Sequence, residues 1–113
     1  MKVHLIKART AIEYAENHAA SLSSIEEWIY KVEHADNWEK PSDMKNTFAT
    51  ASLLGSGSNR VFFDVSGNNH RILCEYYFNE QIDTVTLFIK WMGTHAEYDK
   101  LCSKGGQYTV DEF

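Results

Sequence analysis

The residues that could do chemistry gather in a short run near the end of the chain. Gly93 to Leu101 reads Gly-Thr-His-Ala-Glu-Tyr-Asp-Lys-Leu, which puts a histidine, a tyrosine and an aspartate within about one helical turn. Thr94 and Glu97 have the spacing of a capping box, so a helix is predicted to begin beside His95. Amides left unpaired at a helix start favour an anion. The run therefore indicates either a phosphate-handling corner or an ordinary capped helix.

Three strand candidates lead into this corner. Residues 60–66, 70–78 and 82–92 each alternate apolar and polar side chains, and Gly67-Asn68-Asn69 and residues 79–81 have the composition of tight turns. The pattern predicts an antiparallel meander. In its last strand four apolar residues are in phase: Val85, Leu87, Ile89 and Trp91. Gly93 is predicted to turn the chain between that strand and the helix.

The first half of the chain is predicted to be mainly helical. Val3 to Ile6 indicates a short strand, residues 8–18 a first helix, and Pro41 the start of a third. The second helix is expected to begin with a capping box at Ser23/Glu26 or Ser24/Glu27. It continues through one apolar stripe: Leu22, Ile25, Trp28, Ile29 and Val32. The helices should cover one face of the sheet and leave the other, with Arg71 and Lys90, open to solvent.

Composition limits the class of protein. The chain has 113 residues, 43% of them hydrophobic, and contains two cysteines without metal or redox spacing, which indicates one globular domain in a reducing compartment. It has no apolar run long enough to span a membrane and no recognisable signal peptide. The net charge of −5 argues against a broad nucleic-acid surface, so any RNA contact must be local. Residues from about 103 to 113 are expected to form a flexible tail.

Two motifs in combination resemble a known family. Val61-Phe62-Phe63-Asp64-Val65-Ser66-Gly67-Asn68 is followed by Arg71 and later by Gly93-Thr94-His95-Ala96-Glu97-Tyr98-Asp99. This order resembles the HigB family of bacterial toxins, relatives of RelE, in which a V-F-x-I-x-G-N-x-x-R-L stretch precedes a G-T-H-x-E-Y-D ending. The resemblance covers roughly Trp38 to Leu101. The N-terminal helices match by order and length only.

The resemblance implies an α+β fold: a compact RelE-like domain with a mainly antiparallel twisted sheet and the N-terminal helices on one face. It implies a cytoplasmic toxin that cleaves translated mRNA on the ribosome without a metal or cofactor. The implied partner is a helix-turn-helix, HigA-like antitoxin. The acidic charge favours an alternative, a catalytically inactive module that binds antitoxin or ribosome. A third reading is a metal-independent nuclease that acts without the ribosome.

The resemblance also assigns catalytic roles to three residues. Arg71 is the candidate cation for the phosphate, with a salt bridge to Glu75 as the structural alternative. His95 is the candidate acid or base, and could equally be a surface histidine. Tyr98 could stack on a base, contact the phosphate or simply pack against the sheet.

The remaining candidates are weaker. Asp99, four residues after His95, could hydrogen-bond to it, but a metal site there would lack further ligands. Four residues are predicted to bind substrate: Lys45, Arg60, Lys90 and Asn68. Each of the three cations could instead be a solvated side chain, and Asn68 could serve only to hold its turn.

Overall fold

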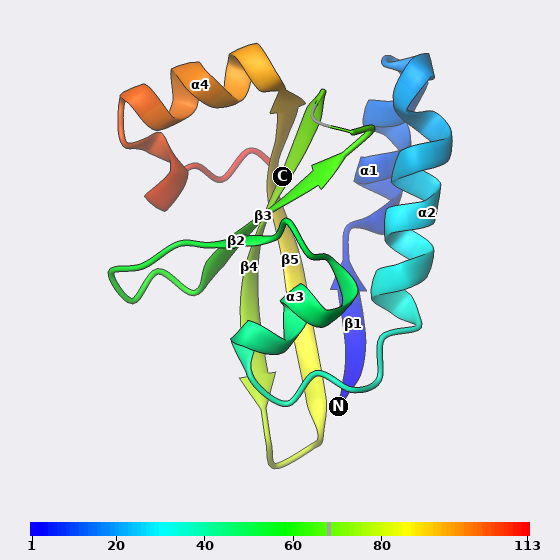
Figure 1. Cartoon of the computed structure of the whole chain (residues 1–113), viewed down its shortest axis with the longest axis vertical. Coiled ribbons are helices and arrows are strands. Elements are labelled where there is room, and N and C mark those ends of the chain that lie inside the picture. Colours follow the sequence, from blue (N-terminus) through cyan, green and yellow to red (C-terminus); the bar gives the residue numbers. More distant parts are fainter. Residues whose placement is uncertain (68) are drawn as a thin grey trace.

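The computed structural model describes residues 1–67 and 69–113, and in these residues it shows a five-stranded sheet with helices on both faces (Figure 1). The strands are β1 (Lys2–Ile6), β2 (Ser52–Leu53), β3 (Arg60–Val65), β4 (His70–Asn79) and β5 (Thr84–Thr94). The helices are α1 (Ala8–Glu16), α2 (Leu22–Glu33), α3 (Met44–Thr47) and α4 (His95–Ser103), together with the 3₁₀ turns η1 (Ala19–Ser21), η2 (Pro41–Asp43) and η3 (Gly106–Tyr108).

The sheet order is β1-β5-β4-β3-β2. The pairs β2–β3, β3–β4 and β4–β5 are antiparallel, and β1 lies parallel to β5 at the edge. The predicted α+β fold with a mainly antiparallel sheet is confirmed, as is the meander of its last three strands. The structure adds β2, which sequence alternation could not reveal because it is only two residues long.

Helices α1 and α2 cover the first face of the sheet. The predicted stripe of α2 is buried at Ile25, Trp28 and Val32, and each fully buried aliphatic side chain contributes about 1.5–3 kcal/mol. Neither predicted capping box forms. The helix begins at Leu22, directly after η1, and its cap Ser21 bonds back to the His18 carbonyl at 2.7 Å. The predicted third helix is correct in place but short, because η2 occupies its first turn.

Strand β5 contains a β-bulge that exchanges its two faces. Leu73 pairs with Trp91 and Cys74 pairs with Ile89, so Lys90 is an extra residue. Before the bulge, the apolar side chains of β5 face α1 and α2; after it, Met92 faces them and Trp91 faces the opposite side. The prediction that Trp91 continues the phase of Ile89 is therefore wrong.

Gly93 does not form the predicted turn. It is a buried residue of β5, which runs on to Thr94 before α4 begins. A Cβ atom on Gly93 would overlap the indole ring of Trp91 and press on the Glu97 carboxylate. The glycine is needed for close packing between the end of the strand and the start of the helix.

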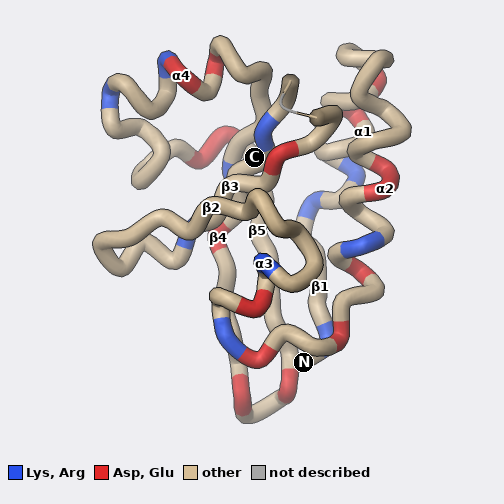
Figure 2. Tube along the Cα trace, in the orientation of Figure 1, with Lys and Arg blue, Asp and Glu red and all other residues tan. Residues whose placement is uncertain are grey.

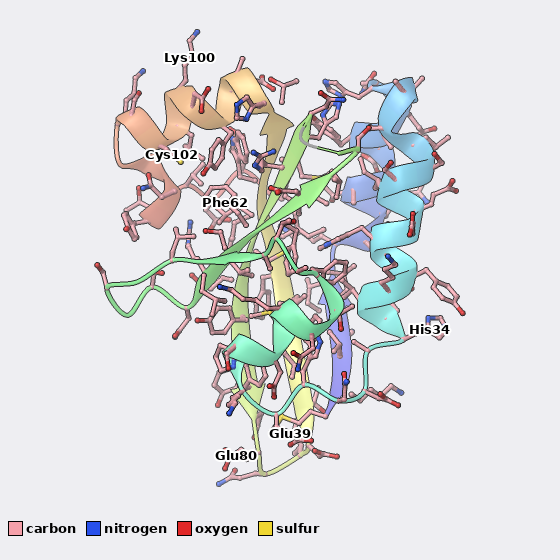
Figure 3. All side chains as sticks on the ribbon, viewed as in Figure 1. His34, Glu39, Phe62, Glu80, Lys100 and Cys102 are labelled. Carbon is pink, nitrogen blue, oxygen red and sulfur yellow. The ribbon has the colours of Figure 1, made fainter. Side chains whose placement is uncertain are left out.

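The second face of the sheet is partly covered, contrary to the prediction that it is open. Helix α4 packs there on a small apolar cluster made by Phe62, Leu73 and Trp91 (Figures 1 and 3). The segment expected to be a flexible tail also lies on this face. Its main chain accepts two hydrogen bonds from Arg60, and Asp111 lies 3.4 Å from Lys90.

Two further observations concern the whole described chain. Its helices, in residues 1–67 and 69–113, are each too short and too polar to cross a bilayer. Positive and negative side chains are interspersed over the fold, so the acidic balance does not come from one element (Figure 2).

Candidate active site at the start of α4

Arg71 is the centre of the site. It lies on β4, on the second face of the sheet, and only 7% of it is exposed. Its Nε atom is 2.9 Å from Asp64 Oδ1, and its Nη2 atom is 3.3 Å from His95 Nδ1. The guanidinium carbon also lies 4.8 Å from the centre of the Tyr98 ring, which is a cation–π distance. The structure thus brings together the three residues assigned catalytic roles, from β4 and α4.

The contact between Arg71 and His95 fixes the proton position on the imidazole. A guanidinium can only donate hydrogen bonds, so Nδ1 of His95 must accept. In the neutral ring the proton then sits on Nε2, which faces the Asp99 carboxylate at 3.6 Å. His95 is half exposed at 48%, so a substrate can reach it. This histidine is held in a form able to accept a proton at Nδ1 once Arg71 takes another partner.

Tyr98 forms one wall of the site. Its ring lies nearly parallel to that of His95, with 6.0 Å between centroids, and meets Phe62 edge-on at 4.9 Å. Burial raises the pKa of Tyr98, so its hydroxyl stays protonated at neutral pH and can donate a hydrogen bond. Packing on the sheet and a role in the site are therefore compatible for this residue.

The capping box that predicted α4 is present. The Thr94 amide donates to Glu97 Oε1 at 2.8 Å, and the Glu97 amide donates to the Thr94 hydroxyl at 3.2 Å. The Thr94 amide lowers the pKa of Glu97 by favouring the carboxylate. The His95 amide donates to the Asn69 carbonyl at 2.9 Å, which ties the helix start to the β3–β4 connection. The first turn of α4 is therefore anchored to the strands that carry Arg71.

Asp64 is a site residue that the sequence interpretation missed. It lies directly opposite Arg71 in the β3–β4 register, and its side chain is 23% exposed. The predicted alternative, a salt bridge from Arg71 to Glu75, is wrong because Glu75 pairs with Arg60 at 3.3 Å. The signal was available, since the turn predicted at Gly67-Asn68-Asn69 would place Asp64 across from Arg71. This partly buried ion pair holds one side of the guanidinium in place.

Three of the four predicted substrate contacts do not lie around this centre. Lys45 is exposed on α3, well away from α4 (Figure 1). Arg60 is 6% exposed and hydrogen-bonds to the C-terminal segment, and Lys90 pairs with Asp111. Asn68 lies outside the described residues.

Asp99 is close to His95 but exposed at 64%, and the contact of 3.6 Å is longer than a hydrogen bond. Across residues 1–67 and 69–113, no three His, Cys, Asp or Glu side chains are placed to hold a metal ion together. The groups that face each other around Arg71 are a fixed cation, an imidazole that can accept a proton and a phenol that can donate one. This set suits the cleavage of a phosphodiester.

Comparison with known proteins agrees with this chemistry. The chain is 29% identical over 85 residues to the mRNA interferase HigB of Escherichia coli O6:H1 (strain CFT073), a match that covers 75% of each protein. Residues 21–101 match the model of a family described as HigB_toxin, a RelE-like toxic component of a toxin–antitoxin system. That match includes every residue placed around Arg71, from Asp64 to Asp99. The chain belongs to the HigB toxin family.

Proposed function

We propose that this protein is an mRNA interferase, the toxin of a type II toxin–antitoxin pair, which cleaves translated mRNA on the ribosome and so inhibits translation. The observation that carries the proposal is the convergence of Arg71, His95 and Tyr98. The family supplies the toxin class, and the name of the Escherichia coli relative supplies the activity. The partner that neutralises it would be a helix-turn-helix, HigA-like antitoxin.

The proposed reaction is a metal-independent transesterification. The ribose 2′-oxygen attacks the adjacent phosphorus and loses its proton, while the bond from phosphorus to the 5′-oxygen breaks and that oxygen gains a proton. The products are a 2′,3′-cyclic phosphate and a free 5′-hydroxyl. The step needs a base, a cation for the charge that develops on the phosphorane, and an acid.

Arg71 suits the cationic role because its guanidinium can hold two phosphate oxygens at once. Asp64 keeps the Nε side of the guanidinium in place, while Nη2 faces the exposed side of the site where His95 lies. When a phosphate takes the Nη2 donor, His95 Nδ1 loses its hydrogen bond and becomes available as the base. Tyr98 remains protonated and would donate to the phosphorane or to the leaving oxygen.

Induced expression with mapping of mRNA 5′ ends tests the proposal. Wild-type protein should arrest growth and produce new 5′-hydroxyl ends inside translated messages. Arg71→Ala and His95→Ala should accumulate as folded protein without those ends. Lys45→Ala is the matched control, because Lys45 is an exposed cation away from the site and its loss should leave cleavage unchanged.

Two outcomes would contradict it. Intact transcripts at full expression of folded wild-type protein would exclude the nuclease. Growth arrest without cleavage, unaffected by Arg71→Ala, would support the inactive binding module instead. Ribosome dependence is tested by repeating the cleavage in a purified translation system with and without ribosomes.

A further inference from the structure

A second group of titratable side chains lies beside the site, on the other face of the sheet. His70 precedes Arg71 on β4 and is paired across the sheet with Thr94. Its ring meets that of His18, with 5.5 Å between centroids. Tyr14, on α1, contacts both rings. The end of α1, the start of β4 and the start of α4 therefore meet at one end of the sheet (Figure 1).

Tyr14 organises both imidazoles through their Nδ1 atoms. Its main-chain carbonyl lies 3.0 Å from His18 Nδ1, and its hydroxyl lies 2.9 Å from His70 Nδ1. A carbonyl only accepts, so His18 Nδ1 carries a proton. Within residues 1–67 and 69–113, neither Nε2 atom has a hydrogen-bond partner. Two half-buried rings thus keep their Nε2 positions available to a ligand.

The charges around the pair favour an anion only when the imidazoles are protonated. Burial lowers the pKa of His70, and nearby His18 lowers it further, whereas the Glu97 carboxylate raises it. Burial and the same carboxylate raise the pKa of Tyr14 to about 12, so its hydroxyl stays neutral. The groups that face His70 are therefore Tyr14 from α1, His18 from the connection between α1 and η1, and Glu97 from α4. A bound anion would offset the repulsion between the two rings.

We propose that His18 and His70 form a second phosphate subsite, which binds another phosphate of the RNA held by Arg71. The two rings are close enough for their Nε2–H groups to donate to two oxygens of a single phosphate. The position follows from the strand, because His70 and Arg71 are adjacent and point to opposite faces at the same end of the sheet. The inference rests on the proposed function, since it assigns a further phosphate of the same RNA substrate.

The chain contains a matched control for this subsite. Tyr30 and His34 at the end of α2 repeat the geometry of Tyr14 and His18, with rings stacked at 4.0 Å and His34 Nδ1 lying 2.8 Å from the Tyr30 carbonyl. His34 lies at the far end of α2 from α4 (Figure 3). It has the same local structure without the second histidine.

Nuclear magnetic resonance of the imidazole protons tests the subsite directly. The probe is a single-stranded RNA tetramer with 2′-O-methyl groups, which cannot be cleaved by transesterification. At about pH 6, near the pKa of an unperturbed histidine, the His18 and His70 signals should shift with RNA and the His34 signal should not. Shifts at His95 without shifts at the pair would overturn the subsite. Absence of any shift at millimolar RNA would overturn it too, because a phosphate subsite must bind a phosphodiester without the ribosome.

The pH dependence of RNA affinity gives a second readout. Wild-type protein should bind the tetramer about tenfold more tightly at about pH 5.5 than at about pH 7.5, because imidazolium donors replace neutral rings. His18→Gln with His70→Gln should remove most of this dependence, whereas His34→Gln should keep it. An unchanged dependence in the double variant would overturn the proposal.

The two hypotheses can fail separately. If wild-type protein cleaves no mRNA but the His18 and His70 signals respond to the tetramer, the nuclease assignment fails and the subsite stands. If Arg71→Ala abolishes cleavage but the double variant keeps the wild-type KM and RNA affinity, the nuclease assignment stands and the subsite fails.

Discussion

Arg60 and Arg71 occupy equivalent positions at two ends of the same strand pair, and their surroundings differ. Both are buried on the second face of the sheet, and each pairs with the carboxylate directly across, Glu75 for Arg60 and Asp64 for Arg71. Arg60 also donates hydrogen bonds to main-chain carbonyls of the C-terminal segment. Arg71 donates a long hydrogen bond of 3.4 Å to the His70 carbonyl and faces the side chains of His95 and Tyr98.

The difference separates an arginine that holds the fold together from one that we propose to be functional. Main-chain carbonyls that are fixed by the fold cannot move aside for a ligand, so Arg60 holds the C-terminal segment against the sheet. An imidazole on the exposed first turn of a helix can give way, so Arg71 can exchange that contact for a phosphate. Burial and charge alone do not distinguish the two residues.

The largest expected effect comes from Arg71→Ala. Because it removes the cation proposed to stabilise the phosphorane, cleavage should fall by about 10²–10³-fold or more. Arg60→Ala should act on stability instead, lowering the free energy of unfolding by about 2–3 kcal/mol and Tm by roughly 10 °C. Primer extension on a translated message measures the first effect, and thermal unfolding by circular dichroism the second.

The distinction between Arg60 and Arg71 would be wrong if the two alanine variants showed each other's expected effects. A full loss of cleavage in folded Arg60→Ala with wild-type-like activity in Arg71→Ala would make Arg60 the substrate-binding arginine, which is the role predicted for it from the sequence.

Removing residues 107–113 tests the structural role of Arg60 by taking away the segment to which Arg60 donates its hydrogen bonds. The deletion takes away both carbonyls that accept from Arg60 and the contact of Val110 with the apolar cluster under α4. It should lower the free energy of unfolding by about 2 kcal/mol and reduce cleavage severalfold by loosening α4. A truncated protein with the wild-type Tm would support the flexible tail expected from the sequence.

Asp64→Asn tests whether the carboxylate of Asp64 holds Arg71 in position. The amide keeps the shape of the carboxylate but removes its charge, so Arg71 would be held less firmly while its own charge is retained. We expect kcat to fall about tenfold, with a loss of about 1 kcal/mol of stability. Single-turnover cleavage rates measure the effect, and Asp99→Asn, on an exposed carboxylate, is the control.

The smallest effect concerns pH. Burial depresses the pKa of His70 in the folded state, so the unfolded chain binds more protons as the pH falls below the ordinary histidine value of about 6.5. The fold should therefore lose stability in that range. Glu97, whose folded pKa is also lowered, should add a further loss below about 4.5. Urea unfolding of wild type and His70→Gln at a series of pH values checks the first step, which the variant should lack.

The sequence predicted the parts of the site that depend on local chemistry. The Thr94/Glu97 spacing identified the start of α4, and the alternation of β4 with a tight turn before it placed Arg71 near that helix. Asp64 could have been found in the same way. Tyr14, His18 and His70 could not, because the turn between α1 and α2 that brings them together has no strong sequence signal.

Other misses have the same kind of physical cause. Trp91 and Met92 are both apolar, so the alternation of Val85, Leu87 and Ile89 continues at Trp91 in the sequence. The pattern therefore does not reveal the bulge at Lys90. Gly93 fits a turn and a crowded strand equally well, and only the position of the Trp91 ring decides between them. The parallel pairing of β1 with β5 joins residues about 80 positions apart, beyond the reach of local patterns.

The bulge at Lys90 also determines on which face of the sheet the candidate active site lies. Side chains of a strand alternate between faces, so an odd number of inserted or deleted residues between Ile89 and Thr94 would move the start of α4 to the opposite face of the sheet. In a chimeric toxin that joins this α4 to another sheet, the number of residues added or removed between Ile89 and Thr94 would have to be even, whatever the identity of those residues. The extra lysine is thus a spacer whose presence matters more than its charge.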